Sequence, residues 1–300
     1  MTTPPTTPAC EPHSLKCLEV WGGSSSADHA ASVPGLDISV SSRPVDGAES
    51  GGDLYLISSC SSGWISRILL ADVAGHGQAV SDLSYKLRKA MHKHLNTVDQ
   101  SKLARTLNST FQDISGGSKF ATALLMTYFA PTGHLILVNA GHPLPLLRRN
   151  GATEWHPIDQ NTPGVLTDPT EARSIGIKNL PLGVIDSTEY EQIAIKINPG
   201  DCICAYTDAF TEAQHNSGKL LGTNGLADTL QRSRSDDNNS YASSVLANFK
   251  EQGFEQADDD HTMLIISHNG ADTPKVKPTT FANLIKNGLG LGHTDTFVTT

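Results

Sequence analysis

Residues 65–79 read ISRILLADVAGHGQA, an apolar run that ends in Asp72 and passes at once into Gly-His-Gly. A short apolar run bounded by a turn predicts a buried strand. A carboxylate beside an apolar core is costly unless a cation or a hydrogen-bond donor meets it. Asp72 is therefore either a cap for the next element or a metal ligand.

The composition is that of an acidic chain with enough apolar residues for a large core. Its 300 residues are 38% hydrophobic and carry a formal net charge of −9. This charge argues against nucleic acid or an anionic membrane surface as the main partner. Neither a signal peptide nor the roughly 20 apolar residues of a membrane span is recognisable, so we expect a cytoplasmic protein. Five cysteines without a CxxC pair argue against a disulfide scaffold, and Cys202 and Cys204, which alternate within a strand-like run, are expected to be buried and reduced.

The segment after Gly77 changes to a helical period. Apolar residues three or four positions apart predict one stripe of an amphipathic helix, formed by Val80, Leu83, Leu87, Met91 and Leu95. Asp99 suits the N-cap of a second helix, whose apolar residues are Leu103, Leu107, Phe111 and Ile114. Two further helices are expected at 226–234 and 241–252.

Strands separated by turns fill most of the remaining chain. They are expected at 18–21, 36–40, 54–57, 64–73, 120–129, 134–139, 144–149, 152–158, 189–197, 202–207 and 262–267. No strand is predicted in the Gly/Ser-rich stretch 22–30. Hairpins and consecutive helix pairs, rather than strand–helix alternation, indicate an α+β fold. We expect two antiparallel β-sheets packed as a sandwich, with helix pairs on the outer faces (α-β-β-α).

The expected domain occupies residues 17–267. Residues 1–16, rich in Thr and Pro, are expected to be a disordered extension. Residues 268–300 form a polar tail, in which an apolar cluster at 281–285 could make one short helix.

Four aspartates occupy the same kind of position. Asp72 and Asp208 follow strands, whereas Asp53 and Asp259 precede them. Strand ends can meet at one rim of a sandwich, where four carboxylates would repel one another strongly without cations. Oxygen ligands favour Mg²⁺ or Mn²⁺, and no His/Cys set has zinc spacing. Each aspartate alone could be a turn or cap residue, but the recurrence favours a metal site.

Six segments together resemble a known family. They are GGD (51–53), LADVAGHG (70–77), FATALLMTYFAPTGHLILVNAGHPLPLL (120–147), PLGV (181–184), GDCICAYTDAFTEA (200–213) and DDHTMLII (259–266). Their order and spacing resemble the metal-dependent protein phosphatases, most closely the bacterial SpoIIE-type branch of the protein phosphatase 2C superfamily. The resemblance runs from about residue 36 to 267.

The resemblance implies a serine/threonine phosphatase with two Mn²⁺ or Mg²⁺ ions between the sheets. Asp72 matches the carboxylate that bridges both ions, and Val73 the backbone carbonyl ligand that follows it. The remaining acidic positions of the metal site are matched by Asp53, Asp208 and Asp259. A hydroxide bridging the two ions would attack the phosphoserine or phosphothreonine monoester, so no side-chain nucleophile is needed.

The chain departs from the family pattern at several positions. Leu56 stands where the first motif usually has a second aspartate. Ala209 replaces the glycine of YTDG and is expected to crowd its turn, and His261 replaces an apolar residue. Ala74 stands where relatives elsewhere in the superfamily have a histidine general acid. His76 is then the remaining candidate for protonating the leaving group.

The resemblance also implies partners. SpoIIE-type relatives act in bacterial partner switching, usually on a phosphorylated anti-sigma-factor antagonist, and are controlled by other domains or proteins. We therefore expect a phosphoprotein substrate and a regulatory protein in trans, or a switch in the helix pair at 77–114. The alternatives are a catalytically silent binding module, against which the retained acids argue, and a metal-dependent nuclease, against which the net charge of −9 argues.

Overall fold

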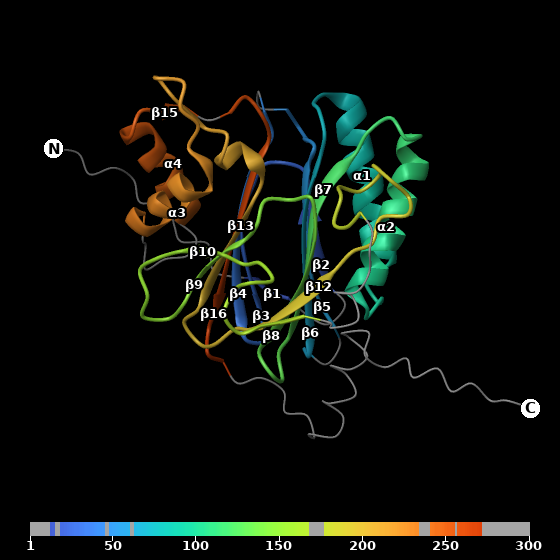
Figure 1. Cartoon of the computed structure of the whole chain (residues 1–300), viewed down its shortest axis with the longest axis horizontal. Helices are drawn as coiled ribbons and strands as arrows, with labels where there is room; N and C mark the ends of the chain where they lie inside the picture. The colour runs from blue at the N-terminus through green and yellow to red at the C-terminus, as the bar shows by residue number, and fades with distance from the viewer. Residues whose placement is uncertain are drawn as a thin grey trace, which may run out of the picture.

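The computed structural model describes residues 13–15, 19–45, 48–60, 63–167, 177–233, 241–255 and 257–271. Two seven-stranded sheets pack face to face, and helices cover both outer faces, which gives four layers in the order α-β-β-α (Figure 1). The α+β sandwich predicted from the sequence is confirmed.

The first sheet has the strand order β1-β3-β4-β16-β13-β9-β10. The β1–β3 pair is parallel, and the other pairs are antiparallel. Its strands are β1 (His13–Ser14), β3 (Ala27–Val33), β4 (Leu36–Arg43), β9 (Leu146–Arg148), β10 (His156–Pro157), β13 (Cys202–Tyr206) and β16 (His261–His268).

The second sheet has the order β11-β12-β8-β7-β6-β5-β2, and all of its pairs are antiparallel. Its strands are β2 (Val20–Gly23), β5 (Asp53–Ser59), β6 (Ile65–Val73), β7 (Ala121–Phe129), β8 (His134–Ala140), β11 (Val165–Thr167) and β12 (Gln192–Lys196). A separate small ribbon pairs β14 (Gln214–His215) with β15 (Phe254–Glu255).

Strand β6 is buried on both faces. Ile68 and Leu70 belong to the core between the two sheets, whereas Leu69 and Ala71 belong to the core beneath the helices. Successive side chains of a strand point to opposite faces. A strand covered on both sides must therefore be apolar throughout, which explains the unbroken run that precedes Asp72.

Two helix pairs complete the layers. Helices α1 (Gln78–Lys93) and α2 (Gln100–Ser115) cover the second sheet, and α3 (Gly222–Arg232) and α4 (Tyr241–Glu251) cover the first (Figure 1). Val80, Leu87 and Met91 of α1 are buried, as their spacing predicts. The expected N-cap of α2 is confirmed, because Oδ1 of Asp99 accepts from the backbone N–H of Lys102 at 2.9 Å.

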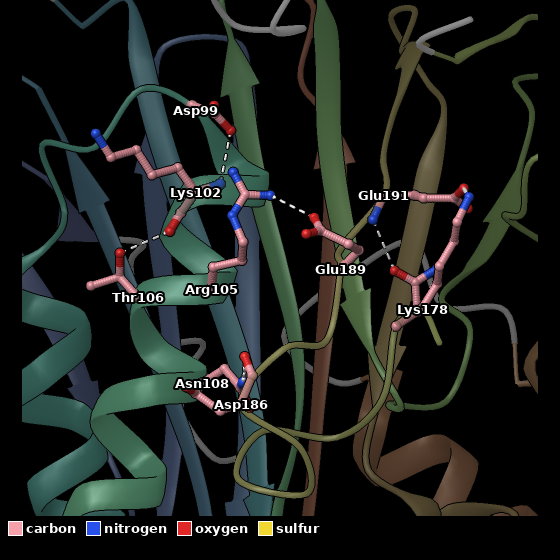
Figure 2. A network of polar contacts seen from close by, with 10 residues as sticks. Asp99, Lys102, Arg105, Thr106, Asn108, Lys178, Asp186, Glu189 and Glu191 are labelled. Carbon is pink, nitrogen blue, oxygen red and sulfur yellow. Dashed lines mark hydrogen bonds and ion pairs between the residues drawn. The ribbon is translucent and has the colours of Figure 1, made fainter. Parts of the chain in front are cut away.

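A polar network fixes α2 to the segment 177–191 (Figure 2). The buried Asn108 donates from Nδ2 to the carbonyl oxygens of Ile185 (2.9 Å) and Asp186 (3.2 Å). Its Oδ1 accepts from the backbone N–H of Gly183 at 2.8 Å. This amide uses both its donors and its acceptor, as a buried amide must. Segment 177–191 is thus held against the helix layer.

Several segments differ from the sequence-based expectation. Strand β3 occupies part of stretch 22–30, where no strand was predicted. Its small residues carry little strand propensity, but Ala27 and Ala31 are buried in the core between the sheets. Strand β1 lies within the extension expected to be disordered and pairs with β3. In 152–158 only β10 forms, and β11 was not predicted.

Other expectations concern single residues and the tail. Cys202 and Cys204 are buried free thiols, as predicted. Cys10, Cys17 and the expected short helix at 281–285 lie outside the described residues. In the part of the chain that the structure describes, no helix combines the length and the apolar character needed to cross a membrane.

The buried stripe of α1 makes a prediction about stability. Leu87 is fully buried between α1 and the second sheet, so Leu87→Ala is expected to lower the free energy of unfolding by about 2–5 kcal/mol. Lys86→Ala, at the exposed neighbouring position, should change it by less than about 0.5 kcal/mol. Urea unfolding of both variants measures this, and equal losses would contradict the packing described.

Candidate metal centre

Asp53 and Asp72 lie opposite each other on paired strands. Asp53 is the first residue of β5, Asp72 is the last but one of β6, and the two are partners in the antiparallel register. Tyr55 and Leu70, two residues along each strand, belong to the core between the sheets. Because side chains repeat their direction every second residue, both carboxylates point into the rim where the sheets meet.

A threonine from the opposite sheet contacts Asp53. Thr207, directly after β13, donates from its hydroxyl to Oδ2 of Asp53 at 2.9 Å. The same hydroxyl accepts from the backbone N–H of Thr262 at 2.9 Å, and the backbone N–H of Thr207 donates to the Thr262 carbonyl at 3.0 Å. Oδ1 of Asp53 is buried without a hydrogen-bond partner among the described atoms.

The Gly51–Gly52 pair allows the last strand to approach this rim. The backbone N–H groups of Gly52 and Val45 donate to the carboxylate of the buried Asp260, the latter at 2.7 Å. A Cβ at Gly51 would lie 2.4 Å from this carboxylate, and a Cβ at Gly52 would lie 2.8 Å from the carbonyl oxygen of Val73. Side chains at these positions would displace two oxygens of the rim, which explains why GGD precedes β5.

Two more predicted acids come from the first sheet. Asp208 does not end a strand but begins the 3-10 turn Asp208–Phe210, after Thr207. Asp259 is exposed and accepts at Oδ1 from the backbone N–H of Asp260 at 2.8 Å. Burial raises the pKa of Asp208, and the charge of Glu212, one turn later, adds to this rise.

The acids act on one another electrostatically. Burial raises the pKa of Asp72 to about 7, with further contributions from Asp208, Asp259, Asp260 and Glu212. Burial, followed by the charge of Asp72, also holds the pKa of Asp53 well above its ordinary value. All the charges that act on Asp72 are negative, so the ionised rim is unfavourable by itself.

Two histidines lie near the rim and differ in burial. His76 is exposed in the turn before α1; part-burial raises the pKa of Asp259, and the nearby His76 opposes this rise. His142 is buried, which lowers its pKa to about 3, and its Nδ1 lies 2.8 Å from the hydroxyl of Thr122. Thr122 is the strand partner of Asp72, which places His142 near the acids, and its lowered pKa keeps the imidazole neutral.

The oxygen atoms gathered at this rim are of the kind that binds a hard divalent cation. They are carboxylate oxygens and a backbone carbonyl, which Mg²⁺ and Mn²⁺ prefer, and the unpartnered Oδ1 of Asp53 offers a buried acceptor. Within the described ranges, no three His, Cys, Asp or Glu side chains stand together in a ready ligand arrangement. The rim thus gathers the charges of a metal site, while Asp53 and Asp260 are held by the chain's own donors.

The family model of stage II sporulation protein E (SpoIIE) matches residues 65–269, more than half of the chain. The chain belongs to the SpoIIE family. No curated protein matches the sequence.

Solved structures show that this SpoIIE-family chain has the fold of PP2C phosphatase domains. The RsbU and RsbW domains of Rv1364c from Mycobacterium tuberculosis share 22% identity, with 86% of this chain and 69% of that chain covered (TM-score 0.62). The PP2C domain and regulatory fragment of SpoIIE from Bacillus subtilis share 15%, covering 87% and 66% (TM-score 0.61). RsbX in complex with magnesium shares 12%, covering 80% and 98% (TM-score 0.55).

The departures from the family pattern have local explanations. Leu56 is buried under the helix layer, so this position of β5 contributes to packing. Ala209 was expected to crowd its turn, and this was wrong: among the described non-glycine residues only Asn179 has a positive φ, so Ala209 needs no left-handed conformation. His261 lies edge-on to the ring of Phe210, 5.8 Å between centroids.

Sequence reasoning overlooked four residues of this rim. Glu212 lies one turn after Asp208, and Asp260 follows Asp259 directly. Both could have been found from the sequence as acids next to predicted metal ligands. His142 follows a glycine in a turn, as His76 does. Nothing in the local sequence pointed to Thr207, because its contact with Asp53 joins residues 154 positions apart.

The pKa of Asp72 predicts how the metal-free protein responds to pH. Its folded value of about 7 lies above the ordinary 3.8, so stability present at low pH is lost as the pH rises through about 7. Asp72→Asn removes this ionisation. The stability of the variant relative to the parent should increase by on the order of 2 kcal/mol from about pH 5 to pH 7.

Urea unfolding in the presence of a chelator measures this difference. Asp258→Asn, which changes an exposed acid near the rim, is the control and should keep the parental pH dependence. The same pH dependence for Asp72→Asn and the parent would contradict the burial of Asp72 among like charges.

Proposed function

We propose that this protein is a metal-dependent protein serine/threonine phosphatase. The observation that carries the proposal is the rim of mutually repelling acids around Asp72, whose pKa burial and four neighbouring carboxylates raise to about 7. A fold gains nothing from such a cluster unless something cationic binds there. Membership of the SpoIIE family and the PP2C fold support phosphoester hydrolysis as the purpose.

The residues that would hold two Mn²⁺ or Mg²⁺ ions are the carboxylates of Asp53, Asp72, Asp208 and Asp259 and the carbonyl oxygen of Val73. When bound, these ions would supply an activated water and neutralise charge on the phosphoryl oxygens. Magnesium in RsbX supports a divalent ion as the cofactor. Asp72 lies opposite Asp53 on the paired strand, and the charge of Asp208 acts on it. Of these acids it is therefore the one best situated to be shared between two ions.

The chain's own side chains would do the remaining work. Thr207 fixes the orientation of Asp53 through its hydroxyl, and Asp260 holds the Gly51–Gly52 backbone beside the rim. His76, exposed and near Asp259, can donate a proton to a leaving serine or threonine oxygen. It is the proposed general acid.

The proposed substrate is a phosphorylated protein, and a small anti-sigma-factor antagonist fits the partner-switching systems of the relatives. RsbU and RsbW domains occur together in one neighbour, and the structure of another is described in connection with the bacterial stressosome. Control by a regulatory protein in trans is also proposed. Ser81 and Ser84 of α1 donate to the carbonyl oxygens of Ser50 and Gly52 at 2.8 and 2.6 Å, so a shift of α1 would move the rim.

Activity on a chromogenic phosphate monoester tests the catalytic proposal. The parent should hydrolyse it with Mn²⁺ and lose activity with a chelator. Asp72→Asn or Asp208→Asn should lower the rate at saturating Mn²⁺ at least about a thousandfold, whereas Asp258→Asn should not. If Asp72→Asn kept half of the parental rate, the metal assignment would be wrong. An inactive parent that still binds Mn²⁺ would favour a silent binding module.

Metal binding should also stabilise the fold. A ligand that binds only the native state stabilises it by about 2–3 kcal/mol at a hundredfold excess over its Kd. Millimolar Mn²⁺ is therefore expected to raise the thermal midpoint of the parent, and to raise it less in Asp72→Asn. Calorimetry measures both shifts, and a midpoint that does not move in the parent would show that the acids do not bind Mn²⁺.

A further inference from the structure

A polar cleft lies beside the acidic rim, between the N-terminal half of α1 and the turn that joins β2 to β3. Its volume is about 460 Å³. Its lining is mostly polar and includes Ser24, Ser25, His29, Gln78, Tyr85 and Arg88. The proposed catalytic chemistry uses none of these side chains.

Helix α1 is rich in basic residues, although the protein as a whole is acidic. The helix carries Lys86, Arg88, Lys89 and Lys93 against one acid, Asp82, although the whole chain has a net charge of −9. In the described ranges, none of these four cations has a carboxylate partner within ion-pair distance. A cationic surface whose charges are not neutralised by carboxylates of the chain suits an anionic ligand.

Arg88 is the cation that faces the cleft. Its Nη1 donates to the carbonyl oxygen of Gly22 at 2.9 Å, which orients the side chain. The guanidinium has five N–H donors, and this is the one hydrogen bond described for it. The ring of Tyr85 lies 5.6 Å from the Arg88 guanidinium carbon and 4.6 Å from Nζ of Lys89. One end of the cleft is therefore cationic, with spare donors.

The other end of the cleft leads to the rim. Ser50 lines the cleft and directly precedes the Gly51–Gly52 pair. The backbone N–H of Gly51 donates to the carbonyl of Ser24 at 2.8 Å, which ties the cleft wall to the rim backbone. Asp82 also lines the cleft, with Oδ1 accepting from Gln78 at 3.0 Å, so it opposes anions in the middle of this path.

We propose that the cleft binds an acidic residue of the phosphoprotein substrate, with Arg88 as the anchoring cation. This inference rests on the proposed function and deepens it, because it names the kind of sequence that the enzyme prefers. Arginine pairs with carboxylates through two parallel hydrogen bonds, which fixes geometry as well as charge.

The helix gives the scale of the spacing between the two anchors, with Gln78, the first residue of α1 after Asp72–Gly77, taken as its end at the rim. From Gln78 to Arg88 the helix rises about 15 Å. An extended peptide covers about 3.3 Å per residue. The acidic residue is therefore expected about five positions from the phosphoserine. A peptide with the acid two positions away should not span the distance.

Synthetic phosphoserine peptides test this with the full chain and Mn²⁺. A glutamate is placed five positions before or after the phosphoserine, and the matched peptides carry glutamine there or glutamate at two positions. In one of the two directions, the peptide with distant glutamate should have a kcat/KM about tenfold above both matched peptides. The preference should shrink in about 0.5 M salt, because a part-exposed ion pair is screened.

Variants of α1 assign the preference to the cleft. Arg88→Gln should bring the glutamate-to-glutamine ratio close to one, and Asp82→Asn should increase it by removing an opposing charge. Lys93→Gln removes an equal charge from the same helix outside the cleft and should keep the parental ratio. Thermal midpoints confirm that each variant is folded. If Arg88→Gln does not fold, the salt dependence of the parent still tests the ion pair.

The outcomes separate this inference from the proposed function. Equal hydrolysis of all peptides by the parent would overturn the cleft assignment and leave the phosphatase proposal intact. The cleft assignment would also be overturned if Arg88→Gln kept the preference for glutamate, or if Lys93→Gln abolished that preference as completely as Arg88→Gln does. No hydrolysis of any peptide or of the chromogenic ester with Mn²⁺ would overturn the proposed function and this inference together.

Discussion

The hydrogen bond from Thr207 to Asp53 joins the two sheets at the rim on which the site depends. Thr207 directly follows β13 of the first sheet, and Asp53 begins β5 of the second; the Thr207 hydroxyl also accepts from the backbone N–H of Thr262. Through this one side chain the ends of β13, β16 and β5 are held together. The carboxylates of both sheets then lie near one another at this rim, where their negative charges repel.

The cost of this arrangement is electrostatic. Burial, followed by the negative charges of the neighbouring acids, raises the pKa of Asp72 to about 7. The apolar layers on both faces of β6 supply the stability that lets the fold tolerate such a rim. A site of this kind is destabilising when ionised and empty of cations, so in the proposed phosphatase cation binding would couple catalysis to stability.

The short segment 50–53 connects the rim to everything around it. It meets Asp260 through the N–H of Gly52, α1 through Ser81 and Ser84, and the cleft wall through Gly51. Glycine is needed at 51 and 52 because a Cβ would collide with rim oxygens. The proposed substrate cleft, helix α1 and the acids of the rim are therefore all connected to one stretch of backbone.

Local sequence determined the elements whose signal is carried by adjacent residues. The stripe from Val80 to Met91 predicted α1, Asp99 predicted the start of α2, and the apolar run before Asp72 predicted β6, because periodicity and capping depend on near neighbours. Tertiary structure decided what depends on distant partners. Strand β3 forms because β4 pairs with it, and Thr207 and His142 join the site through residues far along the chain. Hydrogen bonds and burial between distant segments leave no periodic pattern in a single sequence.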